Sequence, residues 1–383
     1  MDFRKKKVMK IGILTVPFNN NYGGYLQACA LMHVLTQMGH QPCMIMRRHD
    51  ILYRGLYASL KLIIKSLFKA VLYRDKNILL HPFEAFYFVQ GHSMQSFVTK
   101  FITPQTPYLY TWEAVEKKLV NKFDAVIVGS DQVWRPIYVP QIENYFLSFA
   151  KDWKVRRVVY AASFGTITPE YTLKQQTECG KLLQKFDAIS VRELGALDVF
   201  RQFGWQTEGV KVVLDPTLLI KPSFYGNMLK NIEKPVPSHY VFSYILDSNE
   251  GKRNAISDFC KKQNLFLQLI SDIQSDNKEL PSVESWLKNI KEADYVITDS
   301  FHGMVFSIIF HVPFIVLINK TRGTDRFESL LNNISLIDRI CYELTGIDGK
   351  MLQPIDWKSV DTSIQTLREE SLSFLSKSLQ LTR

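Results

Sequence analysis

Short apolar runs alternate with amphipathic stretches along the first half of the chain. Residues 10–16 read KIGILTV, residues 24–39 have helical spacing and end on Gly39, and residues 41–47 are again apolar. This pattern predicts a strand, a helix and a strand. Apolar strands separated by helices are typical of a parallel sheet covered on both faces. Further strands are predicted at 123–129, 156–163, 187–192 and 210–215, with a helix at 193–204.

A second series of strands and helices follows a proline-rich segment. Residues 216–239 hold four prolines and show little periodicity, as a linker does. After it, strands are predicted at 240–246, 265–270, 294–299 and 313–318, and helices at 250–263, 282–293, 302–311 and near 325–332. A polar amphipathic helix is expected at 363–381. The fold class is therefore α/β, with two Rossmann-like domains that face each other across a ligand cleft.

The length of the chain also favours two domains. A chain of 383 residues is too long for one ordinary core. We expect an N-terminal Rossmann-like domain over residues 1–220, a linker over 221–239, a C-terminal Rossmann-like domain over 240–355 and a C-terminal helical segment over 356–383.

The charge of the chain favours anionic partners. Lys and Arg outnumber Asp and Glu by 47 to 37, a net charge of +10, which suits phosphorylated metabolites, acidic glycans, lipid headgroups or nucleic acid. A solvated basic surface is the simpler alternative. Because the basic residues are spread out and no nucleic-acid motif appears, we expect no nucleic-acid partner.

The cysteines and the N-terminal segment indicate a cytoplasmic protein. The five cysteines are scattered without CxxC spacing, which predicts reduced thiols. Lys10 interrupts the first apolar run, so we expect no signal peptide. No run reaches the roughly 18 apolar residues of a membrane-spanning helix.

One basic helix is a candidate for peripheral contact with the inner face of the membrane. Residues 51–76 place Lys61, Lys65 and Lys69 on one stripe with aliphatic residues around it. Such a helix can lie on an anionic lipid surface. Packing against the domain edge with the lysines in water is the commoner alternative.

A histidine stands where a predicted strand meets a predicted helix. Asp299 ends the strand, Ser300 is a typical N-cap, and His302 falls in the first helical turn. Unpaired backbone N–H groups and the helix dipole create an anion site there. His302 can contact such an anion and exchange protons near neutral pH. A capping or packing role is the alternative for a single histidine.

Several cations are predicted at the same edge. Lys320, Arg322 and Arg326 follow the next strand, and Arg192 ends a strand of the first domain. A guanidinium group pairs bidentately with carboxylate or phosphate. A small ligand that carries both groups would suit this set.

The loop after the first strand carries polar side chains suited to a sugar. It is not GxGxxG and lacks the later acidic ribose-binding residue, so we reject a dinucleotide site. Its glycines allow close backbone approach, and its amide and phenol groups suit sugar hydroxyls. These residues are Asn19, Asn20, Asn21, Tyr22, Gly23 and Gly24.

A second polar strand end follows residues 123–129. It carries Ser130, Asp131 and Trp134, a carboxylate beside an aromatic ring of the kind found at carbohydrate sites. Ordinary core packing is an equal alternative for Trp134.

In this order, the blocks NNNYGGYLQACAL, FDAVIVGSDQVW, YAASFG, ISVRE, DPTLL and DYVITDSFHGMVFSIIFHVPFI resemble the polysaccharide pyruvyl transferase family. The resemblance runs from residue 10 to about 331. It implies a GT-B-like fold, phosphoenolpyruvate as donor, and a sugar diol as acceptor. The product would be a pyruvate ketal on a bacterial exopolysaccharide or capsule, or on its lipid-linked precursor. The first domain would then hold the acceptor and the second the donor.

The resemblance also implies roles for individual residues. The family's essential histidine falls on His302 and its conserved arginine on Arg192. Relatives commonly carry Arg-Leu-His where this chain has Ser300, Phe301 and His302. We expect Lys320, Arg322 or Arg326 to replace the missing cation. No cofactor besides the co-substrate is expected, and no HExxH or DxD motif indicates a metal.

We expect His302 to protonate the donor methylene carbon and a carboxylate to accept the hydroxyl protons. Asp131 is the first candidate base and Asp299 the second. The cations would stabilise the departing phosphate.

Two rival functions share this scaffold. A nucleotide-sugar glycosyltransferase of the retaining type usually has a Glu-x7-Glu pair at this late strand-to-helix turn, and residues 299–311 hold no glutamate. Glu284 and Glu292 have the spacing but lie one helix earlier. The other rival is a non-catalytic glycan-binding protein. It stays open because Ser300 stands where relatives commonly carry an arginine.

Overall fold

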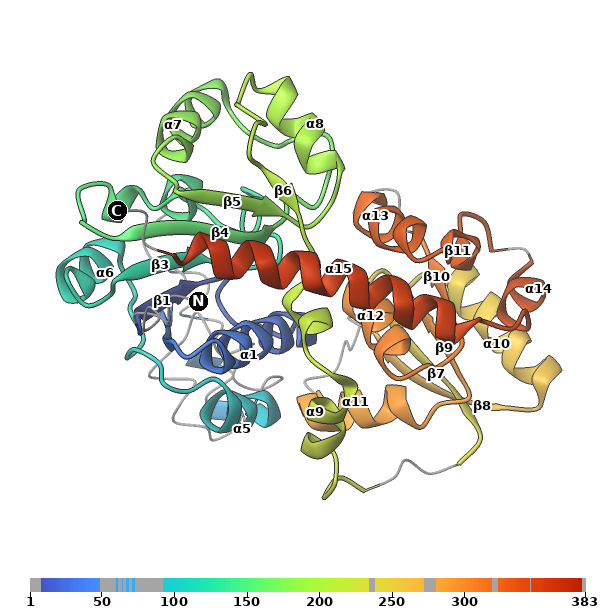
Figure 1. The fold of residues 1–383 in the computed structure, drawn as a ribbon. Helices are drawn as coiled ribbons and strands as arrows, with labels where there is room; N and C mark the ends of the chain where they lie inside the picture. Colours follow the sequence, from blue (N-terminus) through green and yellow to red (C-terminus); the bar gives the residue numbers. More distant parts are fainter. Residues whose placement is uncertain are drawn as a thin grey trace.

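The computed structural model describes residues 8–48, 60, 64, 67–68, 71–72, 92–233, 238–271, 280–318, 323–344 and 346–380. Within these ranges the chain forms two parallel sheets flanked by helices (Figure 1). The α/β class and the two Rossmann-like domains expected from the apolar pattern are confirmed.

The first sheet has the order β2-β1-β3-β4-β5-β6, and all its strands are parallel. Its central strands are buried on both faces, which is why they read as continuous apolar runs. The strands are β1 (Lys10–Leu14), β2 (Gln41–Met44), β3 (Ala125–Val128), β4 (Arg156–Ala162), β5 (Ala188–Val191) and β6 (Lys211–Val212). The helices are α1 (Tyr22–Gln37), α5 (His92–Phe101), α6 (Trp112–Leu119), α7 (Leu173–Leu183) and α8 (Gly195–Gln202).

The second sheet has the order β11-β10-β9-β7-β8 and is also parallel. Its strands are β7 (Tyr240–Ile245), β8 (Phe266–Ser271), β9 (Tyr295–Thr298), β10 (Phe314–Leu317) and β11 (Ile340–Cys341). Its helices are α10 (Glu250–Gln263), α11 (Val283–Lys291), α12 (Phe301–Ile309), α13 (Asp325–Asn333) and α14 (Ile347–Met351).

The connection between the sheets is more regular than a proline-rich linker suggests. A 3-10 helix covers Pro216–Leu219, and α9 covers Pro222–Met228. Both begin on a proline, whose fixed φ suits the first turn of a helix. Two of the four prolines in this segment therefore mark helix starts.

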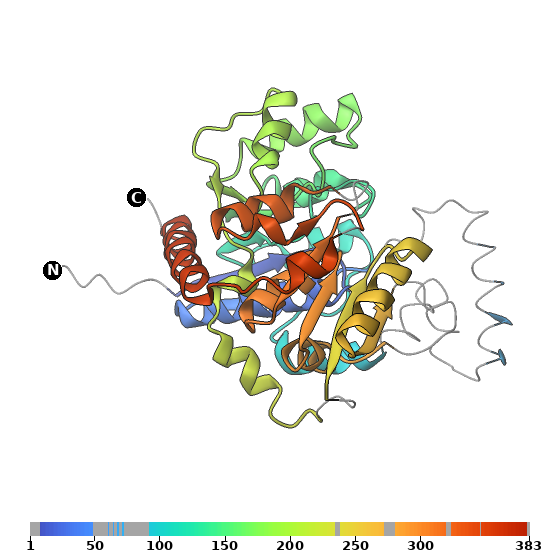
Figure 2. The same cartoon turned by 90° about the vertical axis from the view of Figure 1, so that its right-hand side faces the viewer.

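The C-terminal helix α15 (Trp357–Ser378) crosses both domains (Figure 1). It lies along one side of the molecule, with α10 on the opposite side (Figure 2). Arg368 Nε donates to the Leu218 carbonyl at 2.7 Å, and the Leu214 N–H donates to Ser371 Oγ at 3.0 Å. At the other end, His311 Nε2 lies 2.9 Å from Asp361 Oδ1. The helix thus joins the second domain to the connection.

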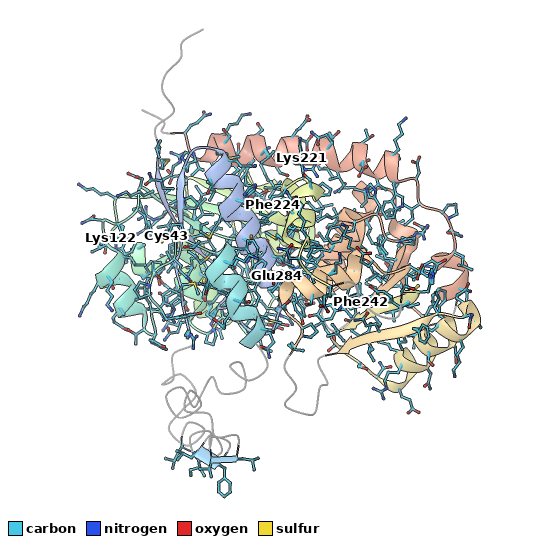
Figure 3. All side chains as sticks on the ribbon, turned by 90° about the horizontal axis from the view of Figure 1, so that it is seen from below. Cys43, Lys122, Lys221, Phe224, Phe242 and Glu284 are labelled. Atoms are coloured by element: carbon cyan, nitrogen blue, oxygen red, sulfur yellow. The ribbon has the colours of Figure 1, made fainter. Side chains whose placement is uncertain are left out.

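One continuous apolar core extends through both domains. Tyr22 of α1 stacks on Trp286 of α11 with ring centroids 5.0 Å apart, and its hydroxyl donates to the Pro281 carbonyl at 2.9 Å. Beside this contact, Glu284 lies where α11 meets α5, 3.9 Å from the Lys100 ammonium (Figure 3). The domains are therefore held in a defined relative position.

Most of the basic segment 51–76, including Lys61, Lys65 and Lys69, lies outside the described residues. The residues described within it are apolar and highly exposed. They are Leu60, Ile64, Leu67, Phe68, Val71 and Leu72, with exposures of 47–80%. None of the helices in the described ranges has both the length and the hydropathy that crossing a bilayer requires. All five cysteines are free thiols.

Candidate active site

A cavity of about 520 Å³ lies between the two sheets. Its volume is within the roughly 300–1,000 Å³ of small-molecule sites. The segments that follow β1, β3, β7 and β9 contribute to its wall. These are carboxyl ends of parallel strands, where ligands bind in doubly wound sheets. The cleft expected from the fold is therefore present, and it is bordered by both domains.

His302 lies in the wall of this cavity, in the first turn of α12. Ser300 caps the helix, since its hydroxyl accepts the Gly303 N–H at 3.3 Å, as the sequence predicted. The His302 ring is buried, and its Nε2 lies 3.6 Å from Asp215 Oδ2. This distance is too long for a hydrogen bond, and within the described part of the chain Nε2 has no other polar partner. The nitrogen is buried and faces the Asp215 carboxylate.

Asp215 connects the two domains beneath the cavity. It lies just after β6 and is fully enclosed. Its carboxylate accepts Ser130 Oγ at 3.0 Å, Arg192 Nη1 at 2.8 Å and the Thr217 N–H at 3.0 Å. Burial alone would raise the pKa of this carboxyl, but the nearby His302 and Arg192 outweigh burial and hold that pKa well below its usual range. Asp215 is therefore an anion that faces His302.

Arg192 does not line the main cavity. Its side chain is only 2% exposed and is surrounded by carboxylates, with Nη2 3.7 Å from Asp131 and Nε 3.9 Å from Glu193. Its guanidinium also lies 4.5 Å from the centroid of the Phe301 ring. It borders instead a second cavity of about 40 Å³. Asp215 and Phe301 thus hold the Arg192 side chain behind the wall of the main cavity.

Arg326, from the first turn of α13, does line the main cavity. Burial and, after it, repulsion from Arg192 lower the pKa of its guanidinium to about 10, against the attraction of Glu193 and Asp131. A buried guanidinium beside another cation favours an anionic ligand, which would relieve both effects. Lys320 and Arg322, the other candidate cations, lie outside the described residues.

The two candidate bases differ in their surroundings. Asp299 borders the cavity, but its carboxylate accepts the Asp247 N–H at 3.0 Å and pairs with the Lys252 ammonium at 2.8 Å. Asp131 accepts the Gln132 N–H at 2.9 Å and the Asn21 side-chain amide at 3.3 Å. Its φ of 78° is in the left-handed region, which is uncommon for a residue with a side chain and is enriched at functional sites.

The polar loop after β1 divides between the cavity and the core. Asn19, Asn20, Asn21 and Gly24 line the cavity. Tyr22 does not, because its ring packs on Trp286 in the core. The structure thus places Tyr22 in the core, away from the cavity where an acceptor would bind.

Gly23 is also absent from the cavity wall, and it serves the neighbouring histidine instead. A Cβ at this position would lie 1.9 Å from His302 Nδ1. The glycine is therefore required by the His302 ring rather than by a ligand.

Two residues of the loop after β3 also lie away from the cavity. Ser130 is fully buried and donates to Asp215. Trp134 is fully buried, stacks on Phe146 at 4.9 Å, and donates through its indole N–H to the Tyr145 carbonyl at 3.2 Å. Neither lines the cavity, and the Trp134 ring packs in the core, which is the alternative arrangement expected for it.

Sequence reasoning missed three residues near the cavity. Asp215 stands in the quoted block DPTLL, and its signal was a carboxylate between an apolar strand and a proline. Arg47 and Trp112 both line the cavity, from the end of β2 and the start of α6. They are 65 positions apart in a part of the chain without a motif, so only the fold brings them together.

Solved structures share this architecture. The UDP-N-acetylglucosamine 2-epimerase of Rickettsia bellii is 12% identical, with 97% of each chain covered and a TM-score of 0.55. The Methanocaldococcus jannaschii UDP-GlcNAc 2-epimerase, in complex with UDP-GlcNAc and UDP, is 13% identical, with 94% of this chain and 99% of that chain covered and a TM-score of 0.50. At these identities the likeness shows the fold alone, which is GT-B.

No curated protein matches the chain in sequence. The family model of the polysaccharide pyruvyl transferases matches residues 21–321, a range that includes α1, the strands from β2 to β10, and His302. Because this match covers most of the chain, the protein belongs to the polysaccharide pyruvyl transferase family.

Proposed function

We propose that the protein transfers the pyruvyl group of phosphoenolpyruvate to a sugar diol of a bacterial surface polysaccharide or its precursor. Family membership supports a transferase. The observation that carries the proposal is the placement of His302 and Arg326, both buried, in the wall of one cavity. An acid and a fixed cation are what a small phosphorylated acid requires.

The donor anion would bind between α12 and α13. The N-terminus of α12 directs backbone N–H groups toward the cavity edge, and Arg326 adds a guanidinium from α13. Arg326 would thus replace the arginine that relatives carry at the position of Ser300. Lys320 and Arg322 stay candidates for the same role. Arg192 would act from behind the wall, since its contact with Asp215 holds that anion in place.

His302 would act as the acid. In its protonated form it would donate a proton to the methylene carbon of phosphoenolpyruvate and leave positive charge on the middle carbon. Asp215, 3.6 Å from Nε2, attracts the protonated ring. A sugar hydroxyl then forms a bond to the middle carbon, the C–O bond to phosphate breaks, and a second hydroxyl closes the ketal. Of the two hydroxyl protons released, one leaves with phosphate and one restores His302.

Asp131 is the base that we propose for the sugar hydroxyls. It lies on the cavity wall close to Asn21, whose amide would orient both the carboxylate and the acceptor. Asp299 is less suited, because two backbone N–H groups and Lys252 already engage it. Asp299 would instead fix the β7 and β9 strand ends that border the cavity.

The reaction is tested by mixing the protein with phosphoenolpyruvate and a panel of lipid-linked or synthetic galactosides and mannosides. We expect phosphate release that depends on the acceptor, and a pyruvyl ketal adduct in the mass spectrum. His302→Gln should abolish both. A nucleotide-sugar glycosyltransferase would instead show protection by a nucleotide sugar in thermal denaturation, and a glycan-binding protein would bind the acceptor without releasing phosphate.

We also propose peripheral contact with the membrane through the exposed apolar stripe, defined as Leu60, Ile64, Leu67, Phe68, Val71 and Leu72. These residues recur at helical spacing, and each is at least 47% exposed. An apolar face of this kind, with lysines in the same segment, suits insertion among anionic headgroups. Such contact would bring the cavity to lipid-linked acceptors.

A further inference from the structure

A second cation borders the main cavity at the end of β2. Arg47 is buried, with 6% exposure, and lines the same cavity as His302. Its Nη1 donates to the Leu109 carbonyl at 3.0 Å, and its guanidinium carbon lies 4.1 Å from the centroid of the Trp112 ring. These two contacts fix the orientation of the planar group, so that less entropy is lost when it binds a ligand.

The support around Arg47 is itself rigid. Trp112 stacks on Phe149 at 5.3 Å on an α6 turn capped by Thr111, and its ring also meets Tyr145 edge-on at 5.6 Å. Trp112 and Tyr145 line the cavity as well. Because the indole is buried and packs against both Arg47 and Phe149, the ring offers little stacking surface for a sugar. It holds the guanidinium instead.

Arg47 and the proposed donor site come from different domains. Arg47 follows β2 of the first domain, whereas His302 and Arg326 lie in α12 and α13 of the second domain. The first domain is the side that we assign to the acceptor. Arg47 is therefore placed with the other substrate.

We propose that Arg47 binds a negative charge on the acceptor, which makes the acceptor an anionic glycan. A buried guanidinium at a ligand cavity selects carboxylate or phosphate by its geometry and charge. The charge can belong to an acidic sugar or to the phosphate of a carrier, and both present the same oxygens to Arg47. This inference rests on the proposed pyruvyl transfer and names the chemical class of its acceptor.

The test compares one disaccharide diol in three forms: a neutral methyl glycoside, the corresponding uronic acid, and the glycosyl diphosphate. Calorimetric titration with each form uses the wild type and Arg47→Gln, Arg47→Lys and Arg48→Gln variants. Arg48 is the matched control, since it is the next residue, carries the same charge, stacks on Tyr108 and does not line the cavity.

We expect at least one charged form to bind the wild type more tightly than the neutral form, by about tenfold or more. Tighter binding of the uronic acid would indicate a sugar carboxylate. Tighter binding of the glycosyl diphosphate would indicate a carrier phosphate. Arg47→Gln should remove that preference, Arg47→Lys should keep part of it, and Arg48→Gln should keep all of it. The inference is overturned if neither charged form is preferred, or if Arg47→Gln, shown to be folded by circular dichroism, retains the preference.

Binding and turnover of phosphoenolpyruvate distinguish a failure of this inference from a failure of the proposed function. Phosphoenolpyruvate should bind Arg47→Gln as tightly as it binds the wild type. Failure of the wild type to bind or turn over phosphoenolpyruvate would contradict the pyruvyl transfer itself. Normal turnover with no charge preference would contradict only the role of Arg47.

Discussion

The His302 ring fills the space that Gly23 leaves open in the first turn of α1. A Cβ at position 23 would lie 1.9 Å from His302 Nδ1 and 2.4 Å from its Cγ. The two residues come from different domains, so the glycine links the position of the proposed acid to the relative placement of the domains.

Gly23→Ala should therefore lower the free energy of unfolding by about 1–3 kcal/mol, the usual effect of overpacking a core. Gly24→Ala is the matched control, because a Cβ there meets nothing within 4 Å. Its stability should be unchanged or slightly higher, since alanine favours a helix. Chemical denaturation of both variants measures the difference. Equal stability of the two variants would show that the His302 ring does not need this space.

Asp215 should make the free energy of unfolding depend on pH. Its pKa is held below the usual range, so the stability that it contributes is present above the unfolded value, about 3.9, and is lost as pH falls below it. Asp215→Asn should be several kcal/mol less stable than the wild type near neutrality, because it leaves Arg192 without its buried partner.

The measurement is urea denaturation between about pH 6 and pH 2. The stability difference between the wild type and Asp215→Asn should narrow as the pH falls. For Asp152→Asn, at an exposed position, the difference from the wild type should remain small throughout. If the difference in free energy of unfolding between the wild type and Asp215→Asn stays constant with pH, Asp215 is not an ionised, paired carboxylate.

Trp134 should affect stability and not ligand binding. The ring is fully buried among Phe146, Phe164 and Phe200. Trp134→Ala should lower the free energy of unfolding by about 3–5 kcal/mol. Trp134→Phe should lose less, and should bind phosphoenolpyruvate and the acceptor with wild-type affinity. A selective loss of acceptor affinity in Trp134→Phe would restore the sugar-contact hypothesis.

The exposed apolar stripe should govern association with lipid. Phe68 is 80% exposed, and burial of such a ring in a membrane contributes about 1.5–3 kcal/mol. Phe68→Glu should therefore weaken co-sedimentation with phosphatidylglycerol vesicles by about tenfold or more. Leu173 of α7 is 81% exposed elsewhere on the surface, so Leu173→Glu serves as control and should bind normally. Equal binding of the wild type and Phe68→Glu would exclude the stripe as the contact.

The apolar pattern was sufficient to predict the strands and their parallel arrangement, because strands buried on both faces must be apolar throughout. The predicted strand ends also placed His302, Asp131 and the asparagine loop at the cleft between the two sheets. Side-chain direction was harder to predict. Whether Trp134 or Tyr22 faces a ligand or the core depends on packing partners such as Phe146 and Trp286, which the apolar pattern does not identify.

The direction of the Arg192 side chain was equally hard to predict from the sequence. Its position at a strand end was predicted, but its burial depends on Asp215 and Phe301, which come from two other segments. The pairing of Arg47 with Trp112 likewise has no local signal, because β2 and α6 are separated by a long segment of the chain.

The central claim is that the cavity between the sheets binds phosphoenolpyruvate through Arg326 and His302. Calorimetric titration of phosphoenolpyruvate into the wild type, Arg326→Gln and His302→Gln tests it most directly, with the exposed Arg253→Gln as a control of equal charge change. We predict binding to the wild type and to Arg253→Gln, and at least about tenfold weaker binding to the other two variants. No binding to the wild type, or equally tight binding to Arg326→Gln and His302→Gln, would contradict the account.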